Sequence, residues 1–319
     1  MKLHYHLIIN ENAGGGNGKN KGDELQALLK EDQASYTSYF TQKPGDEIEI
    51  AAKLAKTDLS AYEPGTLPDP FPLLVVIGGD GTLSKVVNAL ANFPEVPIAY
   101  IPAGSGNDFS RANGIYTKDT RQSYAYIKAA KEPKEVKVLA IKDCLQDQVF
   151  LAVNSVGFGV DAAVIEATHD SQLKRRLNRF RLGGLAYPIS VVRVLFKQKA
   201  FRVQLQLPSG SRTFTKTFLV TAASHPYFGG GIPIAPKACL TKNQLDLILI
   251  EKISWGRIFS IIRRLFKSRH LEHQDVHYHQ YPEMEVLLLD AQPAQADGEV
   301  LGNRQHHFTF TTTSRYFWF

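Results

Sequence analysis

The chain has 319 residues, 44% of them apolar and 21% charged, which predicts about two globular domains of ~150 residues each. Two cysteines, Cys144 and Cys239, exclude a disulfide framework and a four-cysteine zinc module, and they suit a reducing cytosol. A net charge of +6 favours anionic partners, whether small molecules, lipid surfaces or nucleic acid. No run approaches the ~18 apolar residues of a transmembrane helix, and residues 1–10 are too short and too polar for a signal peptide, so we expect a cytoplasmic protein.

The first part of the chain alternates apolar runs typical of buried strands with stretches of helical periodicity. Such alternation implies right-handed crossovers and a parallel sheet, whose ligands bind beyond the carboxyl ends of the strands. Residues 58–72 hold four prolines and are expected to form a loop. The predicted strands are residues 4–10, 35–41, 73–77 and 97–101, and the predicted helices are residues 21–31, 46–56, 82–92 and 119–131.

Beyond residue 135 short strand-like runs dominate, so a β-rich second domain follows. We predict a doubly wound parallel-sheet α/β domain over residues 1–132 and a β-sandwich-like domain with helical insertions over residues 133–304. Residues 305–319 are expected to pack back on the first domain. The predicted strands are residues 136–142, 149–155, 201–207, 213–223, 245–251, 284–290 and 307–312, with helices near 160–168, 183–197 and 255–267.

Three glycine-rich turns follow strands of the first domain. The first, residues 10–19 (NENAGGGNGK), matches neither common phosphate-binding fingerprint. Ala13 and Asn20 stand where a P-loop needs Gly and Ser or Thr, and Lys19 stands where a dinucleotide fold needs its third Gly. Because glycine serves any strained turn, a flexible turn is the competing interpretation.

The second turn, residues 78–82 (GGDGT), directly follows the predicted buried strand 73–77. Its glycines let backbone N–H groups approach phosphate oxygens, and Thr82 is a candidate cap for the following helix. A carboxylate in such a loop repels phosphate unless a cation intervenes, so Asp80 indicates a magnesium-mediated contact. Residues 102–109 (PAGSGNDF) repeat the combination of glycines, hydroxyl and carboxylate after the next strand, and the pair of loops is more specific than either alone.

At these residues the chain resembles the diacylglycerol kinase catalytic family, which includes bacterial soluble lipid kinases and sphingosine kinases and is distantly related to NAD kinases. The GGDGT string is the most specific motif, and residues 101–109 look like the family's second nucleotide loop. Residues Asn10 to Gly14 are similar to its first loop, with Glu11 in place of the usual proline. Residues 154–162 (NSVGFGVDA) and 297–299 (DGE) look like motifs of its second domain, although Asp-Gly taken alone is typical of a β-turn.

The resemblance implies transfer of the γ-phosphate of ATP, with Mg²⁺, to a lipid hydroxyl, with diacylglycerol as the default acceptor. Residues 1–132 would then bind the nucleotide, and residues 133–304 the lipid. Asp80 and Asp108 match carboxylates of the family's magnesium network, and Glu299 matches its proposed general base, so Glu299 and Asp80 are the candidate catalytic residues. The positions that match nucleotide contacts are Asn10, Gly14, Thr41, Gly79, Asp80, Gly81, Thr82 and Ser105.

Three lysines depart from the family pattern. Lys85 stands where the family often has Glu after GGDGTL, which bears on nucleotide or dimer contacts and leaves a homodimer open. Lys137 replaces an Asp near the start of the second domain and would remove one carboxylate from the magnesium network. Lys242-Asn243 aligns with a structural-metal Asp-Gly, so we do not predict that second metal.

Basic segments in the second domain are candidates for peripheral contact with an anionic surface at the inner face of a membrane. Residues 255–269 form an amphipathic pattern, with Arg257, Arg264 and Lys267 opposite the apolar side, although a helix packed on its own sheet is the usual alternative. The cluster at 174–181 is equally typical of a solvated helix face. His270, His273, His277 and His279 lack a fixed zinc geometry, and we predict no nucleic-acid partner because no binding motif is present.

Three functional hypotheses follow. The first is an ATP- and magnesium-dependent lipid kinase. The second is a catalytically weak family member that binds nucleotide or lipid and regulates another process, as Lys85, Lys137 and Lys242 would allow. The third is a kinase of a soluble substrate, of the NAD-kinase type, against which the extended resemblance at residues 101–109 and 154–162 argues.

Overall fold

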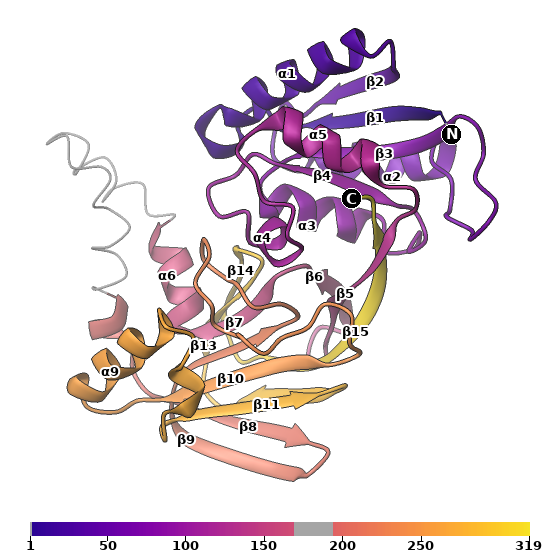
Figure 1. Cartoon of the computed structure of the whole chain (residues 1–319). Helices are drawn as coiled ribbons and strands as arrows, with labels where there is room; N and C mark the ends of the chain where they lie inside the picture. The colour runs from indigo at the N-terminus through magenta and orange to yellow at the C-terminus, as the bar shows by residue number, and fades with distance from the viewer. Residues whose placement is uncertain (1, 169–193) are drawn as a thin grey trace, which may run out of the picture.

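The structure, a computed structural model, describes residues 2–168 and 194–319. Figure 1 shows two domains, the first in indigo to magenta and the second mostly in pink to orange, with the yellow C-terminal strand running from the second domain to the first. Most of the helix predicted at 183–197 and the basic cluster Lys174, Arg175, Arg176, Arg179 and Arg181 lie outside the described residues. None of the described helices is long and apolar enough to cross a membrane.

The first domain is a parallel sheet with the strand order β2-β1-β3-β4. The predicted α/β alternation is confirmed, and one short helix, α4, was not predicted. The strands are β1 (Leu3–Ile9), β2 (Ser35–Phe40), β3 (Phe71–Gly78) and β4 (Ile98–Pro102). The helices are α1 (Asn17–Glu31), α2 (Asp46–Thr57), α3 (Asp80–Ala89), α4 (Asp108–Ala112) and α5 (Thr120–Ala129).

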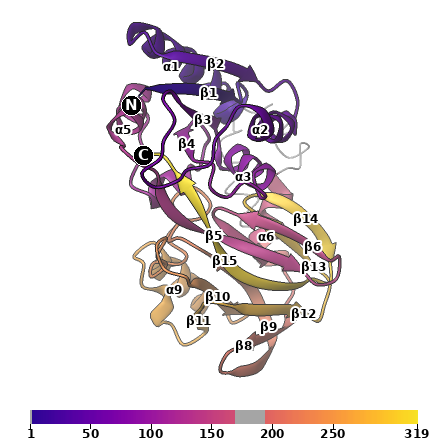
Figure 2. The ribbon, with the colours of Figure 1, turned by 90° about the vertical axis from the view of Figure 1, so that its right-hand side faces the viewer.

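Both faces of this sheet are covered. Along β3, Leu74 and Val76 pack with residues of α2 and α3, whereas Leu73 and Val75 pack with residues of α1 and α5. Figure 2 shows α2 and α3 on one side of the strands and α5 on the other. Burial on both faces explains why β3 is an unbroken apolar run instead of an alternating one.

Helix α1 begins earlier than predicted, at Asn17, so part of the first glycine turn is helical. The glycine at position 18 permits this, because a Cβ there would lie 1.9 Å from the backbone oxygen of Asn10. The helical spacing of apolar residues begins only at Leu25, so the sequence pattern did not reveal the first turns of α1. The turn is a packed helix start and not the flexible segment of the competing interpretation.

The second domain is β-rich, as predicted, with two main helices among its described residues. Its core gathers inward-facing residues of several strands, including Phe158, Val203, Leu247 and Phe308. The strands are β5 (Lys134–Asp143), β6 (Gln148–Ala152), β7 (Ser155–Gly159), β8 (Phe201–Leu207), β9 (Gly210–Ala223), β10 (Leu245–Glu251), β11 (Val276–Tyr281), β12 (Met284–Leu288), β13 (Gln292–Ala296), β14 (Glu299–Arg304) and β15 (His307–Phe317). The helices are α6 (Val160–Thr168) and α9 (Trp255–Leu265).

One predicted strand, residues 149–155, is two strands in the structure. The break falls at Val153 and Asn154, between β6 and β7. The backbone N–H groups of these two residues and of Ser155 all donate to the carboxylate of Asp297, so they are not available to a sheet ladder. A side chain 144 residues away in sequence from Val153 sets this boundary, which local sequence patterns do not reveal.

Strand β15 links the two domains. It pairs with β5 along most of its length, and its last residue, Phe317, lies opposite Ile98 of β4 in parallel register. The next residue, Trp318, is fully buried in the first domain and stacks on Phe71 with ring centroids 5.6 Å apart. Figures 1 and 2 show the C-terminus beside the sheet of the first domain. The strand extends beyond the predicted 307–312 because it continues to pair with β5 as far as Phe317, opposite Lys134.

Candidate active site

The second and third glycine turns pack against each other at the carboxyl ends of β3 and β4. A Cβ at Gly104 would lie 2.6 Å from the Cα of Gly79, so a side chain there would push the turns apart. Asn107 shapes the third turn, since its amide bonds both the N–H and the carbonyl of Gly104. The sheet edge therefore carries two interlocked backbone loops, as expected for ligand binding in an open α/β sheet.

The first glycine turn joins the same group. Gly14 has a φ of 60° and a Cβ there would lie 2.2 Å from the carbonyl oxygen of Ala103, so only glycine fits. The side-chain amide of Asn10 donates to the hydroxyl of Thr82 over 2.9 Å. The predicted capping role of Thr82 is wrong, because α3 begins at Asp80 after the N-cap residue Gly79 and Thr82 lies within its first turn.

A pocket of about 330 Å³ opens between the first two glycine turns and the start of α2. Six of the eight predicted nucleotide contacts line it: Asn10, Gly14, Thr41, Gly79, Gly81 and Thr82. The other two, Asp80 and Ser105, are not among the lining residues. The N-terminus of α3 lies at the pocket, and a helix N-terminus with free N–H groups is a favourable place for an anion.

Asp80 and Asp108 do not point freely into the pocket. The Asp80 carboxylate accepts the backbone N–H groups of Asp108 and Phe109, over 3.0 and 3.3 Å, and so joins the second turn to the third. Asp108 in turn accepts the N–H groups of Gly230 and Gly231, over 2.9 and 2.6 Å, from the second domain. A Cβ built on Gly106 would lie 3.2 Å from Asp80 and 3.6 Å from Asp108, so both carboxylates border one space.

Burial of these carboxyl groups favours their neutral forms. It raises the pKa of Asp80 to about 6, and the charge of Asp108 adds to the effect while the two N–H bonds partly offset it. Burial also raises the pKa of Asp108, again against the N–H bonds that it accepts. Two close carboxylates with raised pKa values are the electrostatic situation that a bound cation relieves.

Glu299 comes to the pocket on a tight hairpin turn between β13 and β14. Asp297 and Gly298 have φ values of 48° and 88°, so the Asp-Gly pair forms the turn that its sequence favours. The same turn carries Glu299, whose carboxylate is half exposed and lines the pocket beside Gly81. The two interpretations of this motif are therefore compatible.

Buried polar groups fix this turn. Asp297 accepts three backbone N–H groups from residues 153–155, as described above. The N–H of Gly298 donates to the side chain of Gln295 over 2.8 Å, and the amide nitrogen of Gln295 donates to the buried carboxyl of Asp161 over 3.0 Å. Glu299, the residue after the turn, is thus positioned by a hydrogen-bond network that extends to Asp161 in α6.

The lysine at position 85 contacts two carboxylates of the pocket. Its ammonium lies 2.9 Å from Oε1 of Glu299 and 3.5 Å from Oε1 of Glu47 at the start of α2. Partial burial lowers the pKa of Lys85, but the two carboxylates outweigh it and the net direction is upward, so the lysine is charged. The sequence singled out Lys85 but not Glu47, which looks like an ordinary acidic residue of a first helical turn.

The other two lysines that depart from the family pattern, Lys137 and Lys242, lie away from the pocket. Lys137 contacts Glu135 and Ser314 on the β5–β15 pair, over 2.6 and 2.7 Å. Lys242 is exposed in a turn, and its neighbour Asn243 accepts the hydroxyl of Thr312. Neither lysine lines the pocket.

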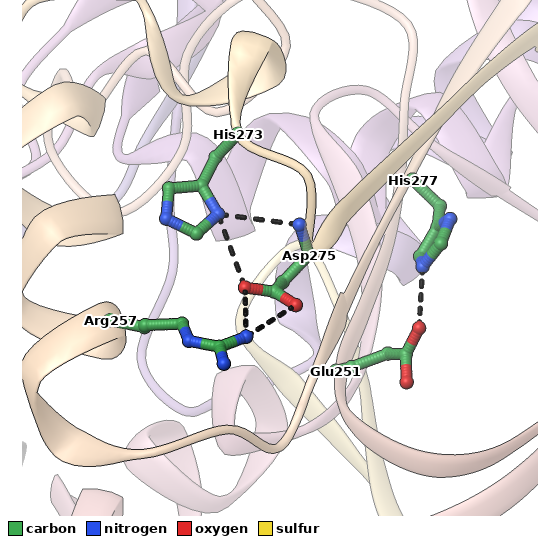
Figure 3. A network of polar contacts seen from close by, with 5 residues as sticks. All are labelled: Glu251, Arg257, His273, Asp275 and His277. Carbon is green, nitrogen blue, oxygen red and sulfur yellow. Dashed lines mark hydrogen bonds and ion pairs between the residues drawn. The ribbon is translucent and has the colours of Figure 1, made fainter.

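The clustered histidines have separate partners. His270 contacts the carbonyl of Ile234 over 2.8 Å, and His277 contacts Glu251 over 2.7 Å. His273 lies against Asp275, which also contacts Arg257, as Figure 3 shows. These three rings thus belong to separate polar contacts, whereas the buried Nε2 of His279 has no hydrogen-bond partner among the described residues.

Comparison with known proteins identifies the class. Residues 4–141 match the family model of the diacylglycerol kinase catalytic domain, and residues 154–312 match that of the YegS C-terminal NAD kinase beta sandwich-like domain. The two models together span nearly the whole chain. This protein therefore belongs to the diacylglycerol kinase catalytic family, a family of lipid kinases, as the motifs indicated.

Individual relatives agree over most of their length. The chain is 29% identical over 302 residues to "Putative lipid kinase YtlR" of Bacillus subtilis (strain 168), which covers 94% of each chain. It is 26% identical over 286 residues to the diacylglycerol kinase of Staphylococcus carnosus (strain TM300), which covers 89% of this chain and 85% of that one. A crystal structure of a diacylglycerol kinase from Bacillus anthracis str. Sterne superposes with a TM-score of 0.71 at 19% identity, over 100% and 97% of the two chains. At 19% identity, the comparison with the Bacillus anthracis structure shows only that the two proteins share a fold.

Proposed function

We propose that this protein transfers the γ-phosphate of ATP to the hydroxyl of a membrane lipid, with diacylglycerol as the default acceptor. The observation that carries the proposal is the pocket itself, which is lined by the first two glycine turns, the N-terminus of α3 and Glu299 from the second domain. A phosphate site and a candidate base in one pocket are the elements that phosphoryl transfer to a hydroxyl requires.

The nucleotide phosphates would bind over the glycine turns. Gly79 and Gly81 leave the backbone open to a close approach, and the amide of Asn10 and the hydroxyl of Thr82 add polar groups to the same wall. Two ammonium groups, those of Lys43 and Lys85, also line the pocket. Lys85 is paired with the carboxylates of Glu47 and Glu299, so Lys43 and the free N–H groups are the features of the pocket that suit a polyphosphate better than a neutral ligand.

The carboxylates of Asp80 and Asp108 border one space outside the lining of the pocket, where they would hold a magnesium ion together with nucleotide phosphates. Among residues 2–168 and 194–319, no group of three or more His, Cys, Asp or Glu side chains has the arrangement of a metal site. Magnesium bound with phosphates needs only one or two carboxylates from the protein, since the phosphates and water complete its shell. When bound, the ion would neutralise phosphate charge and offset the close approach of the two carboxylates.

Glu299 would accept the proton of the acceptor hydroxyl. The hydroxyl oxygen then forms a bond to the γ-phosphorus as the bond to the leaving oxygen of ADP breaks, and the proton stays on the glutamate carboxyl. The carboxylate is half exposed, so an acceptor can reach it from the side of the second domain. The buried network behind Asp297 and Gly298 keeps it at the pocket edge.

The test is an incubation of the purified protein with γ-labelled ATP, magnesium and a total lipid extract, with Glu299→Gln as the matched control. A labelled lipid that depends on Glu299 supports the proposal. ATP binding without any labelled product would contradict it in favour of the regulatory hypothesis. Labelled NADP from added NAD, in place of a labelled lipid, would favour a soluble acceptor.

A further inference from the structure

We infer that one exposed face of α9 docks on the surface of an anionic bilayer. This face, here called the α9 face, consists of Phe259, Arg263, Phe266 and Lys267. The inference deepens the proposed function, because it names the surface that would bring the enzyme to a membrane-resident acceptor, and it rests on that proposal for its choice of partner.

The four residues follow one side of the helix and its C-terminal end. Phe259 and Arg263 lie in α9, Phe266 is its C-cap residue, and Lys267 belongs to the turn that follows. At helical spacing the first three lie within about a quarter turn of one another. Phe259 is 57% exposed and Phe266 is 68% exposed. The opposite side of the helix holds Ile258 and Ile261, both buried against the sheet. Both interpretations of the amphipathic pattern therefore apply, each to a different side of the helix.

Other aromatic residues extend the apolar part of the face. Trp255, in the first turn of α9, stacks against Phe196 with ring centroids 4.2 Å apart. Phe196 is itself 58% exposed. Exposed aromatic rings beside a tryptophan are the side chains that sit at the headgroup level of a bilayer.

The charge of this segment is entirely positive, but only part of it is free. Residues 255–269 hold five basic residues and no acidic one. Arg257 contacts Asp275 (Figure 3), and Arg264 and Arg269 contact Glu272. Within the described parts of the chain, Arg263 and Lys267 make no ion pair.

This distribution corrects the expectation from sequence. The pattern pointed to Arg257, Arg264 and Lys267 as the membrane-facing cations, whereas two of these three are occupied by carboxylates of the second domain. The unpaired cations, Arg263 and Lys267, are those next to the exposed phenylalanines. Unpaired positive charge beside exposed aromatic rings matches an anionic, partly apolar surface.

A second copy of this chain suits the α9 face less well. A symmetric contact between two α9 faces would bring the Arg263 and Lys267 side chains of both copies together without acidic partners. Like charges in a contact of this kind are repulsive. Anionic headgroups offer the opposite charge, and acyl chains accept the phenylalanine rings.

Helix α9 is connected to the strands beside the candidate base through α6. Helix α9 packs with α6 through Ile258 and Val160, in one apolar cluster. Helix α6 contacts β13 and β14, the two strands that carry the turn before Glu299. The buried side of α9 is therefore linked through α6 to the strands that carry the residue proposed to receive the acceptor proton.

The chain offers an internal fluorescence probe for the test. It has two tryptophans: Trp255 beside the α9 face and Trp318, which is fully buried in the first domain. The full chain would be titrated with vesicles of phosphatidylcholine and phosphatidylglycerol in which the phosphatidylcholine carries brominated acyl chains. We expect quenching of the Trp255 emission, and loss of that quenching in Trp255→Phe.

Vesicle flotation with two double variants measures how much the phenylalanine rings and the two cations each contribute to vesicle binding. Phe259→Ser with Phe266→Ser, and separately Arg263→Gln with Lys267→Gln, should each weaken binding to anionic vesicles by about tenfold or more. The controls remove equivalent exposed groups elsewhere: Leu145→Ser with Val149→Ser, and Lys30→Gln with Lys131→Gln. Binding should also fall in high salt, because exposed charges are screened.

Full vesicle binding by both α9 variants would overturn the inference, and so would vesicle quenching that leaves Trp255 unaffected. If the α9 variants kept vesicle binding but lost a dimer that the parent protein forms in sedimentation, the α9 face would be an interface with a second copy. The assay contains no nucleotide and no acceptor. Its failure would therefore leave the kinase proposal standing, and failure of the lipid-labelling test would not alter its result.

Discussion

The ammonium of Lys85 lies 2.9 Å from Oε1 of Glu299, so a lysine contacts the residue proposed to act as the base. The same ammonium lies 3.5 Å from Glu47, whose side chain is almost completely buried. A basic residue at position 85 thus connects a helix of the first domain with the turn of the second. At position 85, where the family often has a glutamate, this chain has a lysine that is the counter-ion of Glu47 and Glu299.

Lys85→Met should destabilise the fold by about 1–3 kcal/mol, because it leaves the buried carboxylate of Glu47 without its cation. The double variant Lys85→Met with Glu47→Gln should regain part of this loss, since it removes the buried charge as well. Urea denaturation measures all three proteins, with Lys85→Arg as the charge-conserving control. A double variant no more stable than the single one would show that the pair is not coupled.

Asp80→Asn should weaken the binding of ATP in the presence of magnesium by at least about tenfold, with little effect in its absence. Asparagine keeps one acceptor for the N–H groups of Asp108 and Phe109, whereas alanine would remove both and disturb the third turn. The Asp80 carboxylate therefore also holds the second and third glycine turns together. Calorimetric titration with and without magnesium is the measurement, and identical curves for the variant and the parent protein would exclude Asp80 from cation binding.

Asp161 should make folding stability pH-dependent. Its carboxyl is buried, and burial raises its pKa from 3.8 to about 6 although Gln295 and Thr221 donate hydrogen bonds to it. Between these two pH values the folded protein holds a proton that the unfolded chain has lost, so the contribution of this group to stability falls as pH rises.

Asp161→Asn removes that titration. The stability of the variant relative to the parent protein should therefore rise between about pH 4 and pH 6, by up to about 3 kcal/mol. A constant offset from the altered hydrogen bonds does not affect this difference in slope. Denaturation curves collected across the pH range test it, and parallel pH dependences for the two proteins would show that Asp161 keeps its ordinary pKa.

Trp318→Ala should destabilise the protein by about 3–5 kcal/mol, because a fully buried indole is removed from its stack on Phe71. The indole N–H also donates to the carbonyl of Ile127, over 3.0 Å. The exposed Phe266→Ala is the matched control and should change stability by less than about 0.5 kcal/mol. Equal unfolding midpoints for Trp318→Ala and the parent protein would mean that the C-terminal segment does not anchor on the first domain.

The sequence predicted the features that depend on local patterns. The buried strands β3 and β4 are continuous apolar runs, and β1 ends in one at residues 7–9. The glycine turns follow these strands directly, so the parallel sheet and its ligand-binding edge were recognisable. Position 299 was found through the DGE motif and its family resemblance. The structure places that residue at the same pocket as the glycine turns.

Other features depend on contacts between distant segments and were missed. Strand β13 (QPAQA) has no apolar alternation and is a strand because it pairs with β7 and β14. The buried Glu47 has no signature in its own segment, since its role arises from Lys85 almost forty residues later. Helical periodicity showed that α9 is amphipathic, but the acidic partners that decide which cations stay free lie on other segments.

The measurement that tests the kinase assignment most directly is the steady-state kinetics of Glu299→Gln with ATP and a dispersed lipid acceptor. Glu299 lines the pocket from the second domain, and as a base it would act on the acceptor hydroxyl and not on the nucleotide. We predict a fall in kcat of about 10²–10⁴-fold with nearly unchanged ATP affinity, the pattern of a group that acts in the transition state. A variant that keeps the full rate, or one that loses ATP binding together with its rate, would contradict this role.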